Sequence, residues 1–252
     1  MIHFVGAGPG AKDLITVRGA ELIKNADVII YTGSLVNKDL LAYAKKEAKV
    51  FDSSKLTLEE VMDIMLREEE TDQNIVRLHT GEPSLYGAVR EQMDILDDKG
   101  ISYDSCPGVS ACFGAAASLD MEYTLPGISQ TLIITRMEGK TPVPESESIK
   151  SLAAHNASMA VYLSTGMLKE LSEELIAGGY KEDTPAAIVY KATWDDEKKY
   201  VCTVGTLYET AEEHDIKKTA VILVGDAVSK KGFKRSKLYD PDFETEFREK
   251  KN

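Results

Sequence analysis

The sequence predicts an α/β protein of two domains, each built around a mostly parallel or mixed sheet. Short apolar runs alternate with segments whose apolar residues recur at helical spacing, which is typical of strands alternating with covering helices. Loops rich in glycine and other small residues follow several runs, where open α/β sheets bind ligands. A second series of runs begins near Gln130, after Pro126 and Gly127 interrupt the pattern.

The first series supplies three clear strands and a set of helical patterns. We expect strands over residues 2–6, 27–31 and 74–79, and helices over residues 16–25, 39–47, 58–70 and about 86–100. The helix over 58–70 is the clearest, because one apolar stripe runs along it, made of Leu58, Val61, Met62, Met65 and Leu66. A further strand ends near Cys106, before an alanine-rich helix over 113–118.

In the second series we expect strands over residues 131–135, 158–163 and 186–191 and a closing pair over 199–204 and 220–224, with a helix over 167–177 and a polar loop over 141–148. These patterns predict an N-terminal domain at 1–121 and a C-terminal domain at 122–228. Residues 229–252 mix basic and acidic side chains with few apolar anchors. We expect them to form a polar tail that is frayed or faces a partner.

Composition and charge disfavour several classes of function. The 252 residues include 30 basic and 42 acidic side chains, a net charge of −12, so the surface repels nucleic acid and anionic membranes. No apolar run approaches the ~20 residues that cross a bilayer. The N-terminus enters a strand without a signal-peptide pattern. We therefore expect neither nucleic acid nor a membrane as a partner.

The cysteines and histidines predict neither disulfides nor a metal site. Cys106, Cys112 and Cys202 are odd in number and form no CxxC pair, which is typical of reduced thiols in a cytoplasmic protein. The four histidines are scattered, with no HExxH motif and no His/Cys cluster. No nucleophile with a neighbouring base and no paired carboxylate stands out, so the sequence nominates no catalytic residue.

The first glycine-rich loop covers residues 5–10 and lies between a strand and a helix. Read with Ala11, it fits the loose dinucleotide pattern G-x-G-x-x-G/A. Two features argue against NAD: Pro9 removes an amide donor from the loop, and the second strand ends in residues 31–34 without the acid that would bind a ribose. Taken alone, the loop is weak evidence, because it is also compatible with a structural turn.

Two further segments combine a strand end with small residues. The stretch over residues 76–87 runs from a strand into a tight loop, where Thr80 and Gly81 leave the main chain accessible and Glu82 offers an acceptor. The stretch over 106–112 again opens a helix with small side chains. Such positions at the carboxyl ends of strands are where open α/β folds bind ligands, although small side chains also pack helices on sheets.

In this order and spacing, the three segments resemble the tetrapyrrole methylase family, and the resemblance covers about residues 1–228. The family's opening pattern V-G-x-G-P-G-x-x-x-L-(I/L)-T-x-(R/K) is matched from Val5 to Arg18, and its glycine-acid-proline loop at residues 81–83. Residues 31–35 and 78–88 most resemble the members that methylate carbon C11 of a corrin precursor. The resemblance implies a homodimer and a cleft between two α/β domains that binds S-adenosylmethionine largely through main-chain atoms.

Carried over by motif, the cofactor contacts implied by the resemblance are Pro9, Thr80, Gly81, Glu82, Leu85, Ser110, Ala111, Leu163 and Ala192. Two positions depart from the pattern. Many relatives have Asp where this chain has Glu82, which moves the acceptor by one methylene. Several relatives have glycine at the position of Ala192, where a methyl group limits the approach of a ligand to the backbone.

The implied substrate is a tetrapyrrole with many carboxylates, so basic side chains should line part of the site despite the acidic total. The candidates for binding it are Arg18, Tyr86, Arg90, Arg136 and Lys191, each also explicable as a surface residue. The side chains expected to pack against the macrocycle are Tyr31, Tyr86, Tyr162 and Trp194.

Other functions stay open at this point. A relative of the same family could act on another ring carbon, on uroporphyrinogen III or on a diphthamide precursor. A dinucleotide-dependent oxidoreductase is disfavoured by Pro9 and by the missing ribose acid. A non-catalytic nucleotide-sensing module would show the same absence of catalytic sets.

Overall fold

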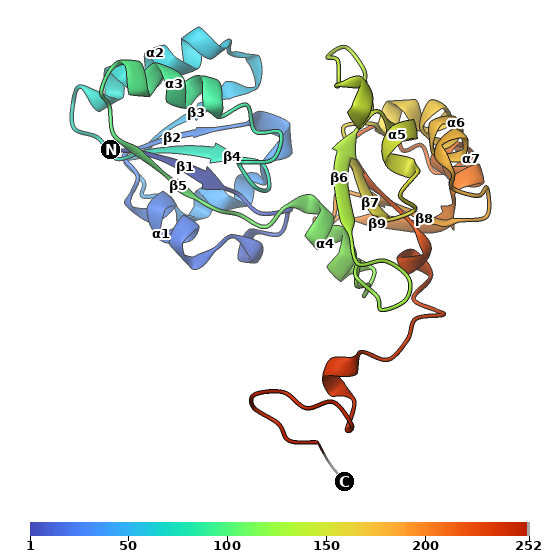
Figure 1. Ribbon diagram of the computed structural model, residues 1–252. Helices are drawn as coiled ribbons and strands as arrows, with labels where there is room; N and C mark the ends of the chain where they lie inside the picture. The colour runs from blue at the N-terminus through green and yellow to red at the C-terminus, as the bar shows by residue number, and fades with distance from the viewer. Residues whose placement is uncertain (251–252) are drawn as a thin grey trace. The chain divides into compact units, whose positions relative to one another are not determined.

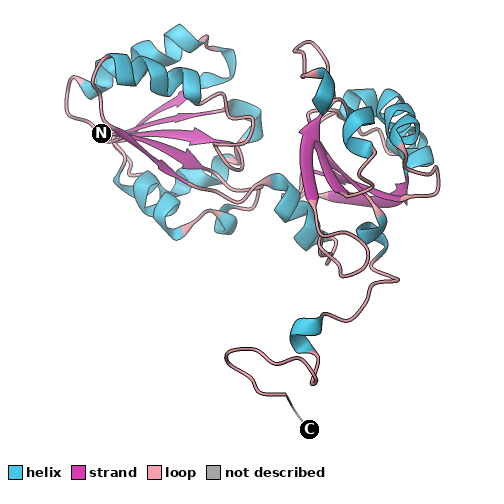
Figure 2. Ribbon diagram, in the orientation of Figure 1, coloured by secondary structure: helices cyan, strands magenta, loops and turns pink. Residues whose placement is uncertain are grey.

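The computed structural model describes residues 1–250, apart from the side chain of Ser34. It contains two five-stranded sheets with helices, so the predicted α/β class is confirmed (Figures 1 and 2). By their contacts the residues form two compact units. Unit 1 holds Met1–Ala115 together with Lys191–Glu197, and unit 2 begins at Ala116 and resumes at Lys198. The domain limits expected at residues 121 and 228 stay predictions.

Unit 1 contains a wholly parallel sheet in the order β3-β2-β4-β1-β5. Its strands are β1 (Ile2–Gly6), β2 (Val28–Tyr31), β3 (Lys49–Asp52), β4 (Ile75–His79) and β5 (Tyr103–Cys106). Its helices are α1 (Val17–Asn25), α2 (Leu58–Glu69), α3 (Arg90–Asp98) and the first part of α4 (Ala111–Ser118).

Alternation along the strands divides the core of unit 1 into two layers. Val5 packs with α1 on one face, whereas its neighbour Phe4 packs with α2 and α3 on the other (Figure 1). The helix starts are fixed locally. The Thr16 hydroxyl accepts from the Gly19 amide at 3.1 Å, and Thr57 and Glu60 form a capping box at α2.

The order of the strands places a switch point between β4 and β1. The chain leaves β1 toward β2 on one side of the sheet and leaves β4 toward β5 on the other. The helices that follow these two adjacent strands, α1 and α3, therefore lie on opposite faces of the sheet. In open α/β sheets the carboxyl edge at such a switch point is where ligands bind.

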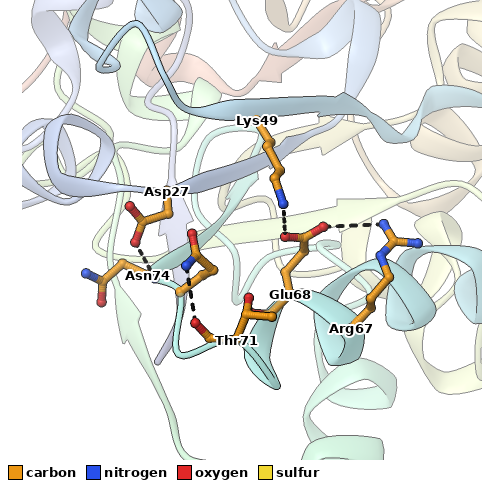
Figure 3. A network of polar contacts seen from close by, with 7 residues as sticks. Asp27, Lys49, Arg67, Glu68, Thr71 and Asn74 are labelled. Carbon is orange, nitrogen blue, oxygen red and sulfur yellow. Dashed lines mark hydrogen bonds and ion pairs between the residues drawn. The ribbon is translucent and has the colours of Figure 1, made fainter.

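A polar network holds the opposite edge of this sheet (Figure 3). Asp27, just before β2, accepts from the amide of Asn74, just before β4, at 2.8 Å. The buried carboxylate of Glu68 in α2 lies 2.6 Å from Nζ of Lys49 in β3. The Lys49 hydrogen bond outweighs burial and holds the pKa of Glu68 below its ordinary value. These contacts link the starts of β2 and β4 to each other and the start of β3 to the end of α2.

Unit 2 contains a mixed sheet in the order β6-β7-β10-β8-β9. Only β6 and β7 are parallel; the other neighbours are antiparallel. The strands are β6 (Leu132–Arg136), β7 (Ser158–Tyr162), β8 (Pro185–Tyr190), β9 (Lys198–Thr203) and β10 (Ala220–Val224). Its apolar core lies between one face of the sheet and the helices α5 (Ile149–Ala153), α6 (Leu168–Gly178) and α7 (Leu207–Glu213).

Several elements differ from the expectation. Residues 39–47 do not form an α-helix; a 3-10 helix, η3 (Lys38–Tyr43), lies there instead. The helix expected from about residue 86 begins only at Arg90, because Tyr86 and Ala88 have left-handed backbones with φ of 57° and 48°. The short edge strand β3 was not expected, since its residues show no buried alternation.

In unit 2 the order of the last strands was not foreseen. The two closing strands, β9 and β10, do not pair with each other: β10 lies between β7 and β8, and β9 pairs with β8. The short helix α5 follows the polar loop without having been predicted. In the tail, Arg248 donates to the carbonyls of Leu238, Asp240 and Phe243. Whether the tail frays or faces a partner stays a prediction.

Candidate functional site

Three loops of unit 1 meet at the carboxyl edge of its sheet, after β1, β4 and β5. Gly8 and Gly81 exchange two main-chain hydrogen bonds, of 3.2 and 3.1 Å. The amide of Ala7 donates to the carbonyl of His79 at 2.8 Å. The two bonds between Gly8 and Gly81 form an isolated antiparallel bridge just beyond the parallel pairing of β1 with β4, and they make the first two glycine-bearing loops neighbours.

Glycines let these loops approach more closely than side chains would allow. A Cβ built on Gly108 would lie 2.1 Å from the carbonyl oxygen of Gly81, and one built on Gly6 would lie 2.6 Å from the Cα of Gly108. Gly8 and Gly81 also have φ of 79° and 60°. The three loops therefore form a wall of main-chain atoms at this edge. The family resemblance implies that main-chain atoms make most of the contacts with the cofactor.

The carboxylate of Glu82 links the second loop to the third. One oxygen accepts from the amide of Ser84 at 2.9 Å and the other from the amide of Gly108 at 2.8 Å. Although partial burial opposes it, these two amides hold the pKa of Glu82 below its ordinary value. Glu82 is thus an ionised residue that shapes the loops.

The turn over residues 83–89 follows Glu82 and is tightly wound. A Cβ on Gly87 would lie 2.1 Å from the carbonyl oxygen of Pro83, so only glycine fits there. Tyr86 and Ala88 have left-handed backbones, which non-glycine residues adopt at a cost of about 1 to 3 kcal/mol. Leu85 is half-buried, and the ring of Tyr86 is exposed.

The loop between β8 and β9 belongs to unit 1 and lies against the first glycine loop. The amide of Ala11 donates to the hydroxyl of Thr193 at 3.0 Å. A Cβ on Gly10 would lie 2.2 Å from Cδ1 of Trp194 and 2.7 Å from the carbonyl oxygen of Ala192. Ala192 is therefore held beside a loop some 180 residues earlier in the sequence.

Eight of the nine predicted cofactor contacts lie in unit 1. Gly81 faces the third loop: its added Cβ would lie 3.6 Å from the Cα of Ser110 and 3.7 Å from the amide nitrogen of Ala111. Pro9 packs against Gly114 of α4. The ninth, Leu163, belongs to unit 2, where it follows β7 with a left-handed backbone and 68% exposure. Their role in binding stays a prediction.

The predicted substrate residues of unit 1 have different surroundings. Arg18 is exposed on α1. Arg90, at the start of α3, donates from Nε to Asp94 at 2.8 Å and also pairs with Asp97. Lys191 forms an ion pair with Asp196 at 2.6 Å, and its ammonium lies 5.4 Å from the centroid of the Trp194 ring. A substrate carboxylate would have to compete with these aspartates.

In unit 2, Arg136 ends β6 and uses its guanidinium on the main chain. It donates to the carbonyls of Met137 and Thr141 at 3.1 Å each and to that of Pro142 at 2.8 Å. These bonds order the polar loop after β6. Its contact with substrate stays a prediction and would replace some of these bonds.

Two ionisable side chains of β4 lie beneath the site. Burial lowers the pKa of Arg77 to about 10, so its guanidinium stays charged at neutral pH. Burial, with the nearby Arg77 charge, lowers the pKa of His79 to about 3. Nε2 of His79 is buried without a hydrogen-bond partner. A neutral imidazole of this kind is unsuited to proton transfer near pH 7.

Gly108 and Thr193 shape the site but were not singled out in the sequence. Gly108 lies in the third small-residue segment. Its importance comes from its closeness to Gly6 and Gly81, which the sequence alone does not show. Thr193 has no local signal, because its partner Ala11 is 182 residues away. Within residues 1–250, no group of three potential metal ligands is assembled, and no helix is long and apolar enough to span a membrane.

Comparison with known proteins yields a family match over most of the chain. The model of the "Tetrapyrrole (Corrin/Porphyrin) Methylases" matches residues 1–208. A cobalt-precorrin-4 C(11)-methyltransferase of Methanocaldococcus jannaschii is 50% identical over 98% of this chain and 95% of its own length. One from Priestia megaterium is 44% identical over 98% and 97%.

Solved structures show the same architecture. The X-ray structure of a cobalt precorrin-4 methyltransferase superposes with a TM-score of 0.88 at 44% identity, covering 90% of this chain and 95% of that one. A uroporphyrin-III C-methyltransferase from Thermus thermophilus, complexed with S-adenyl homocysteine, gives a TM-score of 0.77 at 22% identity, covering 91% and 99%. At that identity the second likeness supports the fold alone.

Proposed function

Because the chain belongs to the tetrapyrrole (corrin/porphyrin) methylase family, we propose that it transfers a methyl group from S-adenosylmethionine to carbon C11 of precorrin-4 or cobalt-precorrin-4. The observation that carries this proposal is the 50% identity, over almost the whole of both chains, to a cobalt-precorrin-4 C(11)-methyltransferase. A uroporphyrinogen-III C-methyltransferase of Bacillus subtilis is 30% identical, which makes that substrate the second candidate.

The main-chain wall of unit 1 fits S-adenosylmethionine. Gly6 and Gly108 leave no room for a Cβ beside the main chain of Gly81, so a ligand at this edge meets backbone donors and acceptors. We assign cofactor contacts to Pro9, Thr80, Gly81, Glu82, Leu85, Ser110, Ala111 and Ala192 in unit 1, and to Leu163 in unit 2. Glu82 would act chiefly by fixing the loops, because both of its oxygens already accept main-chain bonds.

The protein's share of the chemistry is binding and orientation. The cofactor's sulfonium supplies an activated methyl group, and a reduced tetrapyrrole supplies an electron-rich carbon. Holding two reactants in line contributes several kcal/mol, up to about 7–11. This division of labour requires no general base for the attack. It agrees with the neutral, buried state of His79.

The substrate's carboxylates would be bound by basic side chains. Arg18, Arg90, Arg136 and Lys191 are the proposed ligands, with Tyr86 against the ring. Replacing Arg90 by Ala should weaken substrate binding and leave cofactor affinity unchanged. If calorimetry on the folded variant instead finds weaker cofactor binding, this role is wrong.

The same proposal includes a homodimer in the cytoplasm, as the family resemblance implies. Light scattering would test the oligomeric state. Cys106 and Cys112 are buried and form no disulfide, which agrees with a reducing compartment.

Thermal unfolding with excess S-adenosylhomocysteine, beside NAD, tests the reaction class. A ligand at about 100 times its dissociation constant adds about 2.7 kcal/mol of stability, a visible rise in Tm. A rise with S-adenosylhomocysteine alone supports the proposal. A rise with NAD alone would favour an oxidoreductase. Turnover of uroporphyrinogen III, but not of precorrin-4, would replace the substrate and keep the reaction class.

A further inference from the structure

Arg77 is a buried cation whose hydrogen-bond partners are all neutral. It lies in the central strand β4 with only 6% of its surface exposed. Its Nη1 donates to the carbonyl of Ile30 at 3.3 Å and to the hydroxyl of Ser53 at 3.0 Å, and its Nε donates to Oε1 of Gln92 at 3.2 Å. Burying a charged group without an oppositely charged partner is costly. The cost is tolerated here because the guanidinium donates hydrogen bonds to three acceptors.

Gln92 relays this contact to the turn over residues 83–89. Its Oε1 is taken by Arg77, so its Nε2 faces the other way and donates to the carbonyl of Ala88 at 3.0 Å. Ala88 has a left-handed backbone, as does Tyr86 two residues earlier. Such conformations persist in non-glycine residues only where the surroundings over-determine them.

We propose that Arg77 is a positioning residue, which through Gln92 fixes the turn that presents Leu85 and Tyr86 to the ligands. The turn is held at its start by Glu82, bound to Ser84, and at its end by this relay. The inference rests on the proposed function, in which Leu85 contacts the cofactor and Tyr86 the substrate. It adds a residue pair that touches neither ligand.

The variant Gln92→Glu separates positioning from folding. A carboxylate still accepts from Arg77, and more strongly, because the bond becomes charge-assisted. It has no hydrogen to donate to the carbonyl of Ala88. We expect Tm without ligand to be unchanged or higher, while the Kd for S-adenosylhomocysteine rises about tenfold, equivalent to about 1.4 kcal/mol. A merely structural pair would show no loss of affinity.

Gln73→Glu is the matched control in the same unit. Gln73 also donates from Nε2 to a main-chain carbonyl, that of Thr71 at 3.2 Å, but it belongs to the opposite edge of the sheet. It should leave the Kd for S-adenosylhomocysteine unchanged. An equal loss in both variants would mean that added negative charge, not the turn, weakens binding, and would overturn the inference.

A rescue variant completes the test. Glycine adopts a left-handed backbone without strain, so Ala88→Gly should restore affinity when combined with Gln92→Glu. This readout stays decisive if Gln92→Glu alone lowers Tm. Unchanged affinity in Gln92→Glu, or no recovery in the double variant, would overturn the role of Arg77. If the unaltered protein fails to bind S-adenosylhomocysteine, the proposed function fails instead.

Discussion

Glu82 and Gly108 are joined by a hydrogen bond of 2.8 Å from the glycine amide to the carboxylate, across 26 positions of the chain. The same carboxylate accepts from Ser84. A single side chain thus ties the loop after β4 to the loop after β5, at the carboxyl edge of the sheet beside its switch point. The loops are held by main-chain closeness and by this one charge.

Replacing Glu82 by Gln should loosen both loops. The amide nitrogen of glutamine would face a main-chain N–H, so one of the two donors loses its acceptor. We expect unfolding to become easier by about 1 to 3 kcal/mol and the affinity for S-adenosylhomocysteine to fall. Denaturant unfolding and calorimetry would measure the two effects. Glu209→Gln, on the exposed side of α7, should change neither.

The pH dependence follows from the lowered pKa of Glu82 in the folded protein. A depressed carboxylate pKa stabilises the fold above the ordinary value of 4.5, and this contribution is lost as the pH falls through the lower, folded value. The difference in Tm between the unaltered protein and Glu82→Gln should therefore shrink on acidification from pH 7 to pH 3. A difference that stays constant across this range would contradict an ionised Glu82.

Gly108→Ala tests the close approach of the three loops. Its new Cβ would lie 2.1 Å from the carbonyl oxygen of Gly81 and 2.8 Å from the Cα of Gly6. Both are backbone atoms, so the loops must separate. We expect the free energy of unfolding to fall by about 3 kcal/mol or more. Gly166→Ala is the control, since its nearest neighbour would be 3.9 Å away. Equal unfolding curves for the two variants would argue against the packed wall.

Local patterns predicted the longer helices and the buried strands, because the causes of these elements are local. The apolar stripe of α2 is visible within one helix, and β1 is a short, mostly apolar run. The turn before α3 escaped prediction because nothing in Tyr86 or Ala88 indicates a left-handed backbone. That conformation depends on Gln92 and on the absence of a Cβ at Gly87.

The site was predictable in its loops but not in its assembly. Motif resemblance supplied Gly81, Glu82 and Ala192, whereas their contacts with Gly108 and the first glycine loop depend on strand order. Thr193 is the clearest case, since its partner Ala11 lies in the opposite third of the chain. No periodicity within a window of residues reports such a pair.

The ion pair between Lys49 and Glu68, at the opposite edge of the sheet, should lose different amounts of stability depending on which partner is replaced. Lys49→Met leaves the buried carboxylate of Glu68 with Arg67 alone, 3.5 Å away, whereas Glu68→Gln leaves only an exposed lysine unpaired. We expect Lys49→Met to lower the free energy of unfolding by about 1 to 3 kcal/mol, and Glu68→Gln to lower it by less. Chemical denaturation would compare them, with the exposed Lys46→Met as control.

Acid should reduce the cost of Lys49→Met. The pKa of Glu68 is lowered by Lys49 in the folded protein, so the pair's contribution disappears as the pH falls through that folded value. The gap between Lys49→Met and the unaltered protein should close below the ordinary pKa of 4.5. A gap that persists at pH 3 would assign the loss to packing of the lysine stem.

Trp194 is the single tryptophan of the chain and lies against Gly10 of the first glycine loop, so its fluorescence reports on the site. We expect S-adenosylhomocysteine to change its emission in a saturable way. Thr193→Val removes the hydroxyl that accepts from Ala11 and should weaken binding about 2- to 10-fold, the effect of one neutral hydrogen bond. Thr131→Val, beside β6 in unit 2, is the matched control. An affinity equal to that of the control would mean that the loop between β8 and β9 does not help to form the cofactor site.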